Sequence, residues 1–292
     1  MAHGIAGIDH VILGVRDLEQ ARATYEHLGF RATPRGRHVG WGTANYCLMF
    51  PSDYVEILGI VDSSKFTNDL DRFLEEREGL ARLALRSTDP VATHAAWHEA
   101  GLEPADIVDL ARLLEPDIEL RFKNVMLERE ALGNLPLFAC AHLTPEPMRR
   151  REWLEHPNGA LGIGSVTVVA DDPNALAAPL AQVFGPSSLT ETDDTLAVHT
   201  GDSVLLLATP DDLDMLHPQI DALVTDRLPA LVALTLRVAD PDRTAAFLEH
   251  RKVEHRRGAD GAVGIDPEHT HGVMLEFVAA ARQPQSLADL LR

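Results

Sequence analysis

The chain has 292 residues, of which 45% are hydrophobic, so it is long enough for about two domains with a substantial core. Its 45 Asp and Glu residues against 26 Lys and Arg residues give a formal net charge of -19, which repels nucleic-acid phosphates and anionic membrane surfaces. With two cysteines, no signal-peptide pattern and no apolar run of the roughly 20 residues that cross a bilayer, the composition excludes a disulfide framework and predicts a cytoplasmic protein with no nucleic-acid or membrane partner.

One passage recurs four times along the chain: an apolar strand, an Asp, a helix, and then short runs rich in β-forming residues. The copies begin near Ile8, Leu80, Ile163 and Leu231. An Asp suits the N-cap because its carboxylate can accept a hydrogen bond from a free N–H of the first helical turn. The four capping residues are Asp17, Asp89, Asp172 and Asp240. Pro follows the last three of them, and Gly29 and Gly101 end the first two helices, as helix boundaries favour.

The β-rich runs behind the helices predict short antiparallel strands. The first copy contains FRATP, ANYCLMF and YVEILGI, the second ELRFKNVML and PLFACAHL, the third TLAVHT and SVLLLAT, and the fourth VEHRR and GVMLEFV. The unit is therefore β-α-β-β-β. One such sheet cannot cover both of its faces, so pairs of units should curl together around a shared concavity in an α+β protein.

We predict two domains of two modules each: an N-terminal domain over residues 1–143, which holds the site, and a C-terminal domain over residues 161–292. Residues 144–160 are predicted to link them, because this segment has several prolines and a basic run, Arg149 to Arg151, that suits a solvated helix face. An insertion after Asp62, SSKFTNDLDRFLEEREG, is predicted to form an amphipathic surface helix.

One histidine and one glutamate of the first copy are candidates for chemistry. His10 lies on the first strand and Glu56 on the last. If both strands curl around one concavity, the imidazole and the carboxylate converge inside it, and such a pair suits a divalent cation. The alternative for His10 is a satisfied core histidine, whereas a Glu among apolar strand residues is costly unless it is paired.

The first copy also carries a recognisable set of segments, namely IDHVILGVRDLEQA, HLGF, RGRHVGWGTAN and YVEILGI. In these segments the chain resembles the vicinal oxygen chelate superfamily, in particular its glyoxalase-like branch (the glyoxalase, bleomycin resistance and extradiol dioxygenase group). The resemblance covers the whole chain as four modules and is detailed over residues 8–61. It implies βαβββ modules that form two open, cup-shaped mixed β-sheet barrels, often with a metal held by a first-strand His and a last-strand Glu. His10 and Glu56 occupy those positions.

The other copies depart from this pattern. Arg82, Ser165 and Ala233 stand where the first copy has His10, and the carboxylate recurs only at Glu276. A transition metal needs about three protein ligands, so the C-terminal domain is predicted to be a scaffold without a metal.

Further side chains of the N-terminal domain are candidates to complete the site. His142 follows Cys140 at a spacing that puts both side chains on one strand face, and His38 lies in the loop before the third strand. Both are candidate metal ligands, and His38 and Glu56 are also the candidate catalytic residues. Alternatively, Arg82 pairs with Glu56 and replaces the cation, which gives a metal-free site.

Four residues are candidates for substrate binding: Arg82, Trp41, Asn45 and Arg121. Trp41 and Asn45 lie in RHVGWGTAN, whose glycines, aromatic ring and polar groups suit a ligand-contacting loop or, alternatively, a structural turn. Arg121 could bind a substrate carboxylate, although a solvent-facing strand side is the stronger alternative.

The resemblance and the pairing of His10 with Glu56 together predict a divalent-metal enzyme acting on a small oxygenated metabolite, with Fe, Mn, Ni or Zn as the ion. The cation would bind two neighbouring substrate oxygens as a Lewis acid while a side chain moves a proton, an architecture shared by lyases, isomerases and ring-cleaving dioxygenases. The alternative is a metal-free protein of the same fold that binds or sequesters a small molecule. The expected partner is that small molecule, and a homodimer is the assembly that we consider.

Overall fold

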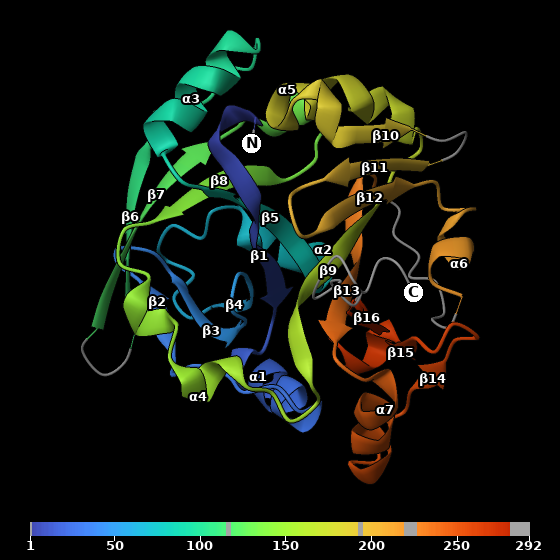
Figure 1. Cartoon of the computed structure of the whole chain (residues 1–292). Helices are drawn as coiled ribbons and strands as arrows, with labels where there is room; N and C mark the ends of the chain where they lie inside the picture. Colours follow the sequence, from blue (N-terminus) through green and yellow to red (C-terminus); the bar gives the residue numbers. More distant parts are fainter. Residues whose placement is uncertain (1, 115–117, 192–194, 219–226, 281–292) are drawn as a thin grey trace, which may run out of the picture.

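The computed structural model describes residues 2–114, 118–191, 195–218 and 227–280. It contains two eight-stranded mixed β-sheets, one from each half of the chain, with helices packed around them (Figure 1). Both sheets follow the repeated β-α-β-β-β order, so the predicted α+β class and its four modules are confirmed. No helix within the described ranges is long and apolar enough to cross a membrane.

The first sheet is a closed barrel in the order β1-β4-β3-β2-β6-β7-β8-β5. Its first module comprises β1 (Ile5–Val15), α1 (Leu18–His27), β2 (Gly36–His38), β3 (Thr43–Met49) and β4 (Tyr54–Ile60). Its second module comprises β5 (Gly79–Ser87), α3 (Pro90–Glu99), β6 (Val108–Leu114), β7 (Ile118–Met126) and β8 (Leu137–His142). Antiparallel pairing of β1 with β5 and of β2 with β6 closes the ring, where the resemblance implied an open cup.

The second sheet runs in the order β10-β11-β12-β9-β13-β16-β15-β14. Its first module comprises β9 (Ala160–Val169), α5 (Ala177–Phe184), β10 (Leu189–Glu191), β11 (Thr195–His199) and β12 (Val204–Ala208), and the short helix α6 (Leu213–Leu216) follows. Its second module comprises β13 (Ala230–Val238), α7 (Pro241–His250), β14 (Arg256–Arg257), β15 (Val263–Ile265) and β16 (Met274–Ala279). The edge strands β10 and β14 do not pair with each other among the described residues, so this sheet stays open.

All four predicted N-caps form. Backbone amides of the first helical turn donate hydrogen bonds to the side chains of Asp17, Asp89, Asp172 and Asp240. The third helix begins as a 3-10 turn, Pro173–Leu176, which continues into α5. Gly29 follows α1 with a φ of 89°, a left-handed conformation that glycine adopts without steric penalty.

The short strands differ from the sequence prediction. FRATP forms only an isolated bridge at Ala32, and the second strand of the first module is instead β2. The strands β6, β10 and β15 have no counterpart among the predicted strands. These segments are short or charged, so hydrogen bonds to neighbouring strands, and not a hydrophobic pattern of their own, hold them extended.

The predicted linker packs onto the barrel. It contains α4 (Arg151–Leu154), and its Met148 and Trp153 are buried with the apolar side chains of the barrel interior. Arg149 donates hydrogen bonds to two carbonyls of the turn between β3 and β4, so the basic run is not wholly solvated as expected. The predicted surface insertion does contain a helix, α2 (Leu70–Glu76).

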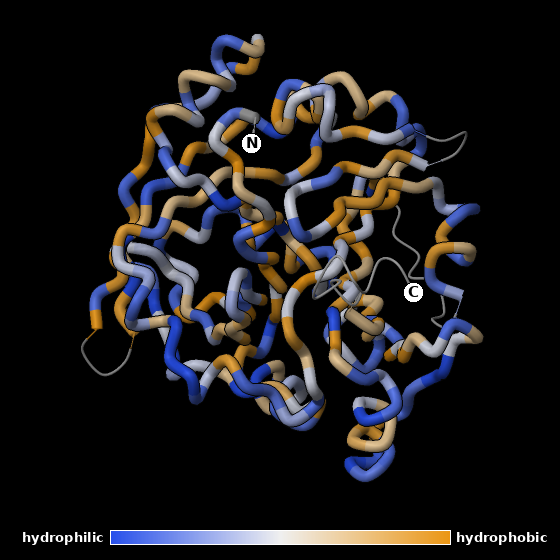
Figure 2. The backbone as a smooth tube through the Cα atoms, viewed as in Figure 1, coloured by the Kyte–Doolittle hydropathy of each residue, from blue (hydrophilic) through white to orange (hydrophobic). Residues whose placement is uncertain are grey.

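The two halves of the chain share one apolar core. Buried side chains of β1 and β5 in the barrel and of β9 and β13 in the second sheet belong to a single cluster. Hydrophobic residues accordingly follow the central strands, while the outer helices alternate between hydrophobic and hydrophilic residues (Figure 2). Trp97 of α3 donates an indole hydrogen bond to the Val183 carbonyl of α5 at 3.1 Å, and Tyr25 of α1 donates its hydroxyl to the Thr270 carbonyl at 3.0 Å. The outer face of the barrel is therefore held by the other half, and polar side chains collect inside it.

Candidate functional site

A cavity of about 230 Å³ lies inside the barrel. Its polar lining includes His10, His38, Glu56, Arg82, Arg112 and Cys140. Its apolar lining includes Ile12, Leu58, Phe122 and Phe138, together with Trp41 and Phe66. The barrel thus brings His10, Glu56 and His38, which are far apart in the sequence, to one cavity.

A bulge in β1 places Asp9 beside His10. Ile8 pairs with Leu85 of β5 and His10 pairs with Ala84, so Asp9 is one extra residue on the β1 side. Strict alternation would send Asp9 and His10 to opposite faces, but a bulge locally re-aims a side chain. The sequence analysis missed Asp9 because the bulge depends on pairing with β5, which no local pattern in IDHVIL reveals.

The Asp9 carboxylate orients two imidazoles. Its Oδ2 atom lies 2.6 Å from Nδ1 of His10 and 2.9 Å from Nε2 of His142. Burial by itself raises the pKa of Asp9, but the two imidazoles outweigh burial and hold that pKa well below its usual range. Because the ionised carboxylate only accepts, both nitrogens donate to it. His10 is therefore a proton donor at Nδ1, and its Nε2 points away from Asp9.

Glu56 lies on the other side of His10. Its Oε2 atom is 3.5 Å from Nε2 of His10, and its Oε1 atom is 3.7 Å from Nε2 of His38. The side-chain amide of Asn45 donates a hydrogen bond to Oε1. Burial raises the pKa of Glu56, but His38, His10 and Arg112 outweigh it and leave that pKa below its usual value. Glu56 is thus a buried, ionised carboxylate.

His38 lies on β2 and contacts Glu56 from the opposite side. Its Nδ1 atom is 2.9 Å from the hydroxyl oxygen of Thr43, and its ring centre is 5.3 Å from that of Trp41. Burial is the largest influence on its pKa and lowers it to about 4, against the attraction of Glu56. His38 is consequently neutral at pH 7 and able to accept a proton.

Arg112 is a site residue that the sequence analysis missed. It lies on β6, is only 2% exposed, and places Nη1 3.7 Å from Oε1 of Glu56. Its other contacts are the sulfur atoms of Cys47 at 3.3 Å and Met148 at 3.0 Å. One signal in the sequence could have revealed its strand. LLEPDIEL has apolar residues on both sides of the turn-forming Pro and Asp, a pattern typical of a hairpin, and Arg112 lies just before it.

Arg82 does not pair with Glu56, contrary to the alternative considered from the sequence. Its guanidinium donates to the carbonyl of Asn68 and lies 4.0 Å from the carboxylate of Asp69. It still lines the cavity. The cation next to Glu56 is instead Arg112 of β6.

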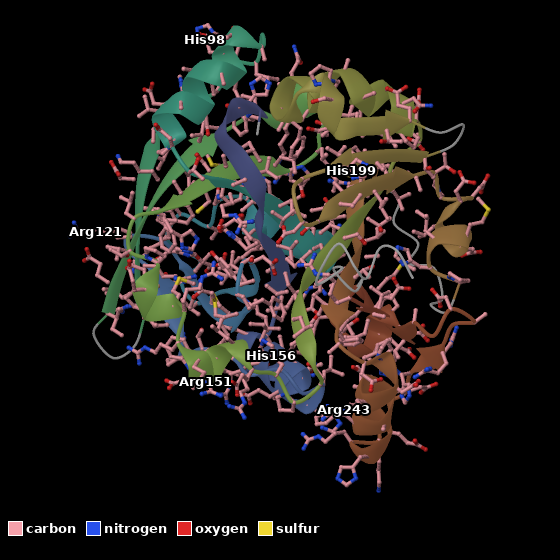
Figure 3. The ribbon with its side chains drawn as sticks, viewed as in Figure 1. His98, Arg121, Arg151, His156, His199 and Arg243 are labelled. Carbon is pink, nitrogen blue, oxygen red and sulfur yellow. The ribbon has the colours of Figure 1, made fainter. Side chains whose placement is uncertain are left out.

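The remaining predicted substrate-binding residues occupy three different environments. Trp41 lines the cavity and packs edge-on against Phe66, with ring centres 5.0 Å apart. Asn45 is buried behind Glu56 and does not line the cavity. Arg121 lies on the outer edge of the barrel (Figure 3), where its side chain is 66% exposed and 2.7 Å from Glu119. The solvent-facing alternative for Arg121 therefore matches its position.

The second sheet repeats the geometry with other side chains. Val232 is the extra residue of a matching bulge in β13, and Ala233 stands in the place of His10. Glu276 is the equivalent of Glu56, because it pairs with Thr235 on the neighbouring strand as Glu56 pairs with Ile12. Its carboxylate accepts a hydrogen bond from the Thr235 hydroxyl at 3.0 Å. The strand histidine and the bulge carboxylate of the first copy thus have no counterparts at these strand positions, and the histidine beside Glu276 is instead His217, whose Nδ1 lies 3.5 Å from Oε2.

One group of described residues has the donor atoms to hold a metal ion. Its members are Asp9, His10, Cys140 and His142, whose donor atoms all lie within 4.8 Å of one another. His142, a candidate metal ligand in the sequence analysis, enters this group from β8 and contacts Asp9. His10 is shared between this group and Glu56, so it occupies the centre of the donor set.

Comparison with known proteins identifies the family. A family profile described as "Glyoxalase-like domain" matches residues 8–184, which is more than half of the chain. The chain belongs to the glyoxalase-like domain family. This membership places it in the vicinal oxygen chelate superfamily, as the segments of the first copy predicted. No curated protein matches this glyoxalase-like chain.

Solved structures share the fold of this glyoxalase-like protein at low sequence identity. A hypothetical protein from Staphylococcus aureus has a TM-score of 0.69 at 13% identity, covering 94% of this chain and 99% of that one. The Mn(II)-bound glyoxalase from Novosphingobium aromaticivorans has a TM-score of 0.56 at 11% identity, covering 94% of this chain and 82% of that one. A mutant of 4-hydroxymandelate synthase from Streptomyces coelicolor has a TM-score of 0.56 at 14% identity, and the match covers 96% of this chain and 94% of that one.

Proposed function

We propose that the protein is a divalent-metal-dependent enzyme that acts on a small oxygenated metabolite inside the barrel, as a lyase, an isomerase or a dioxygenase. The observation that carries this proposal is the approach of His10 Nε2 to Glu56 Oε2 at 3.5 Å. Nδ1 of His10 is bonded to Asp9, so Nε2 is the nitrogen that faces the ionised carboxylate of Glu56. A proton or a metal cation must lie between Nε2 and this carboxylate, and in this proposal it is a metal cation.

The chemistry of the donor set fits a divalent transition metal. Metal–nitrogen and metal–oxygen bonds of about 2.0 to 2.2 Å allow a nitrogen and an oxygen ligand to sit at roughly this separation. His10 and Glu56 would hold the ion, and Cys140, which lines the same cavity, would supply the next ligand, while His142 is bonded to Asp9 on the other side of His10. A carboxylate on the far nitrogen of a ligating histidine is a common support for metal sites, and Asp9 occupies that place. Fe, Mn, Ni and Zn all accept such ligands.

When bound, the cation supplies a Lewis acid that stabilises negative charge on two neighbouring substrate oxygens. His38 is the group that moves a proton. It is neutral at pH 7 because burial lowers its pKa to about 4, and its Nδ1 is held by Thr43, which leaves Nε2 for the substrate. The apolar side chains of Phe122 and Phe138 exclude water from the reacting atoms.

The comparisons support an enzyme of this kind. The Mn(II)-bound glyoxalase shares the fold and carries a metal, and 4-hydroxymandelate synthase shares it as a named synthase. Lewis-acid stabilisation of adjacent oxygens is common to the lyase, isomerase and dioxygenase reactions that we propose.

A second candidate is a metal-free protein that binds or sequesters a small molecule. The second module favours this candidate because it has neither of the two ligands. Arg82 stands in the place of His10. Phe138 pairs with Ala84 as Glu56 pairs with Ile12, so Phe138 stands in the place of Glu56. In this case His10 carries a proton on both nitrogens, and Arg112 neutralises Glu56.

Metal analysis separates the two candidates. Protein expressed with added Mn, Fe, Ni or Zn should retain about one equivalent of metal, and a free-metal concentration a hundredfold above Kd should stabilise it by about 2.7 kcal/mol. Less than about a tenth of an equivalent, with no shift of the unfolding midpoint on adding any of these ions, would favour the metal-free candidate.

Variants test which half holds the site. His10→Ala and Glu56→Gln should abolish metal binding because each removes one of the two facing ligands. The control is Glu276→Gln, which changes the equivalent carboxylate of the second sheet and should leave binding nearly intact. Loss of binding in the control, with binding retained in His10→Ala, would place the site in the other half.

A further inference from the structure

Arg112 is a buried cation without adequate hydrogen-bond acceptors. The residue is 2% exposed, and its Nε atom has no hydrogen-bond partner. Its terminal nitrogens donate to the thiol sulfur of Cys47 and the thioether sulfur of Met148, and both sulfurs are weak acceptors. A buried guanidinium normally engages carboxylate or carbonyl oxygens with its five N–H groups. This one does not.

The Glu56 carboxylate does not meet this need. The separation of 3.7 Å between Nη1 and Oε1 is longer than a charge-assisted hydrogen bond, which is about 2.7 to 2.9 Å. Oε1 of Glu56 already accepts the amide of Asn45, while Oε2 faces His10. The guanidinium therefore keeps unused donors at the wall of the cavity.

The surroundings of Arg112 define what could use those donors. The side chain lines the cavity beside Phe122, whose ring centre is 5.3 Å from the guanidinium carbon. The lining also includes Leu110, two residues before Arg112 on β6, and Trp41, which packs edge-on against the exposed Phe66. Two other arginines line the cavity: Arg82 already donates to the carbonyl of Asn68, and Arg129 is exposed. A ligand that satisfies Arg112 therefore has an anionic end deep in the barrel and an apolar body toward Phe66.

We propose that Arg112 binds the carboxylate of an organic acid whose apolar tail lies along Phe122 toward Trp41 and Phe66. This inference deepens the proposed function, because it names the substrate class of the same cavity. A neutral apolar ligand would leave the free donors of Arg112 without an oxygen acceptor, whereas a carboxylate supplies two.

Paired acids and amides test the proposal on the unmodified protein. Phenylacetate is compared with phenylacetamide, and hexanoate with hexanamide, by calorimetric titration of protein freed of metal and again with Mn²⁺ added. We expect each acid to bind at least about tenfold more tightly than its amide, which is about 1.4 kcal/mol. Equal affinities within each pair, or no binding of either acid, would overturn the proposal.

Variants assign the preference to one side chain. Arg112→Met should reduce the preference for acid over amide to about twofold or less, while Arg112→Lys keeps the charge and should retain part of it. Arg243→Met removes an exposed positive charge from α7 and should not change the preference. A preference that persists in Arg112→Met, or that disappears only in Arg82→Met, would overturn the assignment. Because the acid and amide pairs are measured on wild-type protein, an unfolded Arg112 variant does not remove the test.

The experiments can refute the metal-dependent enzyme and the role of Arg112 independently of each other. An acid preference in metal-free protein that retains no metal would leave the role of Arg112 standing and refute the metal-dependent enzyme. Metal binding without an acid preference would refute the role of Arg112 and leave the proposed function standing.

Discussion

The hydrogen bond between His10 Nδ1 and Asp9 Oδ2 is 2.6 Å long and buried. It decides which nitrogen of His10 faces Glu56, so the candidate metal site depends on a residue that does not line the cavity. Asp9 also accepts from His142, and a single carboxylate thereby fixes two imidazoles. We regard Asp9 as a positioning residue.

Asp9→Asn should weaken metal binding about 10-fold to 100-fold, the range typical of lost support behind a ligating histidine. Both imidazoles bond to the same atom, Oδ2, so an Asn whose amide oxygen takes that place keeps both acceptor sites but loses the negative charge that strengthens the two hydrogen bonds. The measurement is a metal titration monitored by thermal unfolding. Asp17→Asn is the matched control, because Asn caps a helix as well as Asp does. Unchanged affinity in Asp9→Asn would mean that His10 needs no charged partner.

At the scale of elements, the sequence was sufficient for the features that have local causes. The capping aspartates and the 3.6-residue pattern placed the helices, and the long apolar strands β1, β4, β5 and β8 were evident. The sequence also placed His10 on the first strand and Glu56 on the last strand of the first copy, and these two strands lie side by side in the barrel. Asp9 and Arg112 escaped prediction because their positions depend on partners: the bulge at Asp9 exists only against β5, and β6 is held between β2 and β7. The hairpin of β6 and β7 does have a local signal, but the pairing of β6 with the distant β2, which brings Arg112 to Glu56, has none.

The contribution of one N-cap, Asp172 of the second sheet's first module, to the stability of the protein can be measured. Asp172→Ala should destabilise the protein by about 1 kcal/mol, because the amides of Asn174 and Ala175 lose their acceptor. The neighbouring exposed Asp171 provides the matched control, and Asp171→Ala should change stability by less than about 0.5 kcal/mol. Urea denaturation measures both. Equal effects would show that charge near the helix, and not the cap, matters.

At the scale of the whole molecule, the connector between the two sheets is part of the barrel's support. His156 lies in this connector and is 8% exposed. Its Nδ1 accepts a hydrogen bond from the backbone amide of Arg31 at 3.0 Å, and its Nε2 donates to the carbonyl of Met49 at 2.9 Å. This arrangement needs a neutral ring, because a protonated Nδ1 could not accept. Burial, the largest influence, and the positive charge of Arg31 outweigh the hydrogen bond to the Met49 carbonyl and lower the pKa of His156 to about 4.

The low pKa of His156 should make the stability of the fold depend on pH. In the unfolded chain a histidine has a pKa of about 6.5, so the unfolded state binds a proton first as pH falls. The contribution of His156 is therefore complete above pH 6.5 and is lost as pH falls toward 4, by about 2 kcal/mol at pH 5. The free energy of unfolding of His156→Gln should decline less than that of wild type between pH 7 and pH 5, by about this amount. His250→Gln, at an exposed position of α7, is the control, and its free energy of unfolding should depend on pH as that of wild type does. If the free energy of unfolding of His156→Gln falls in parallel with that of wild type, His156 is protonated in the folded protein.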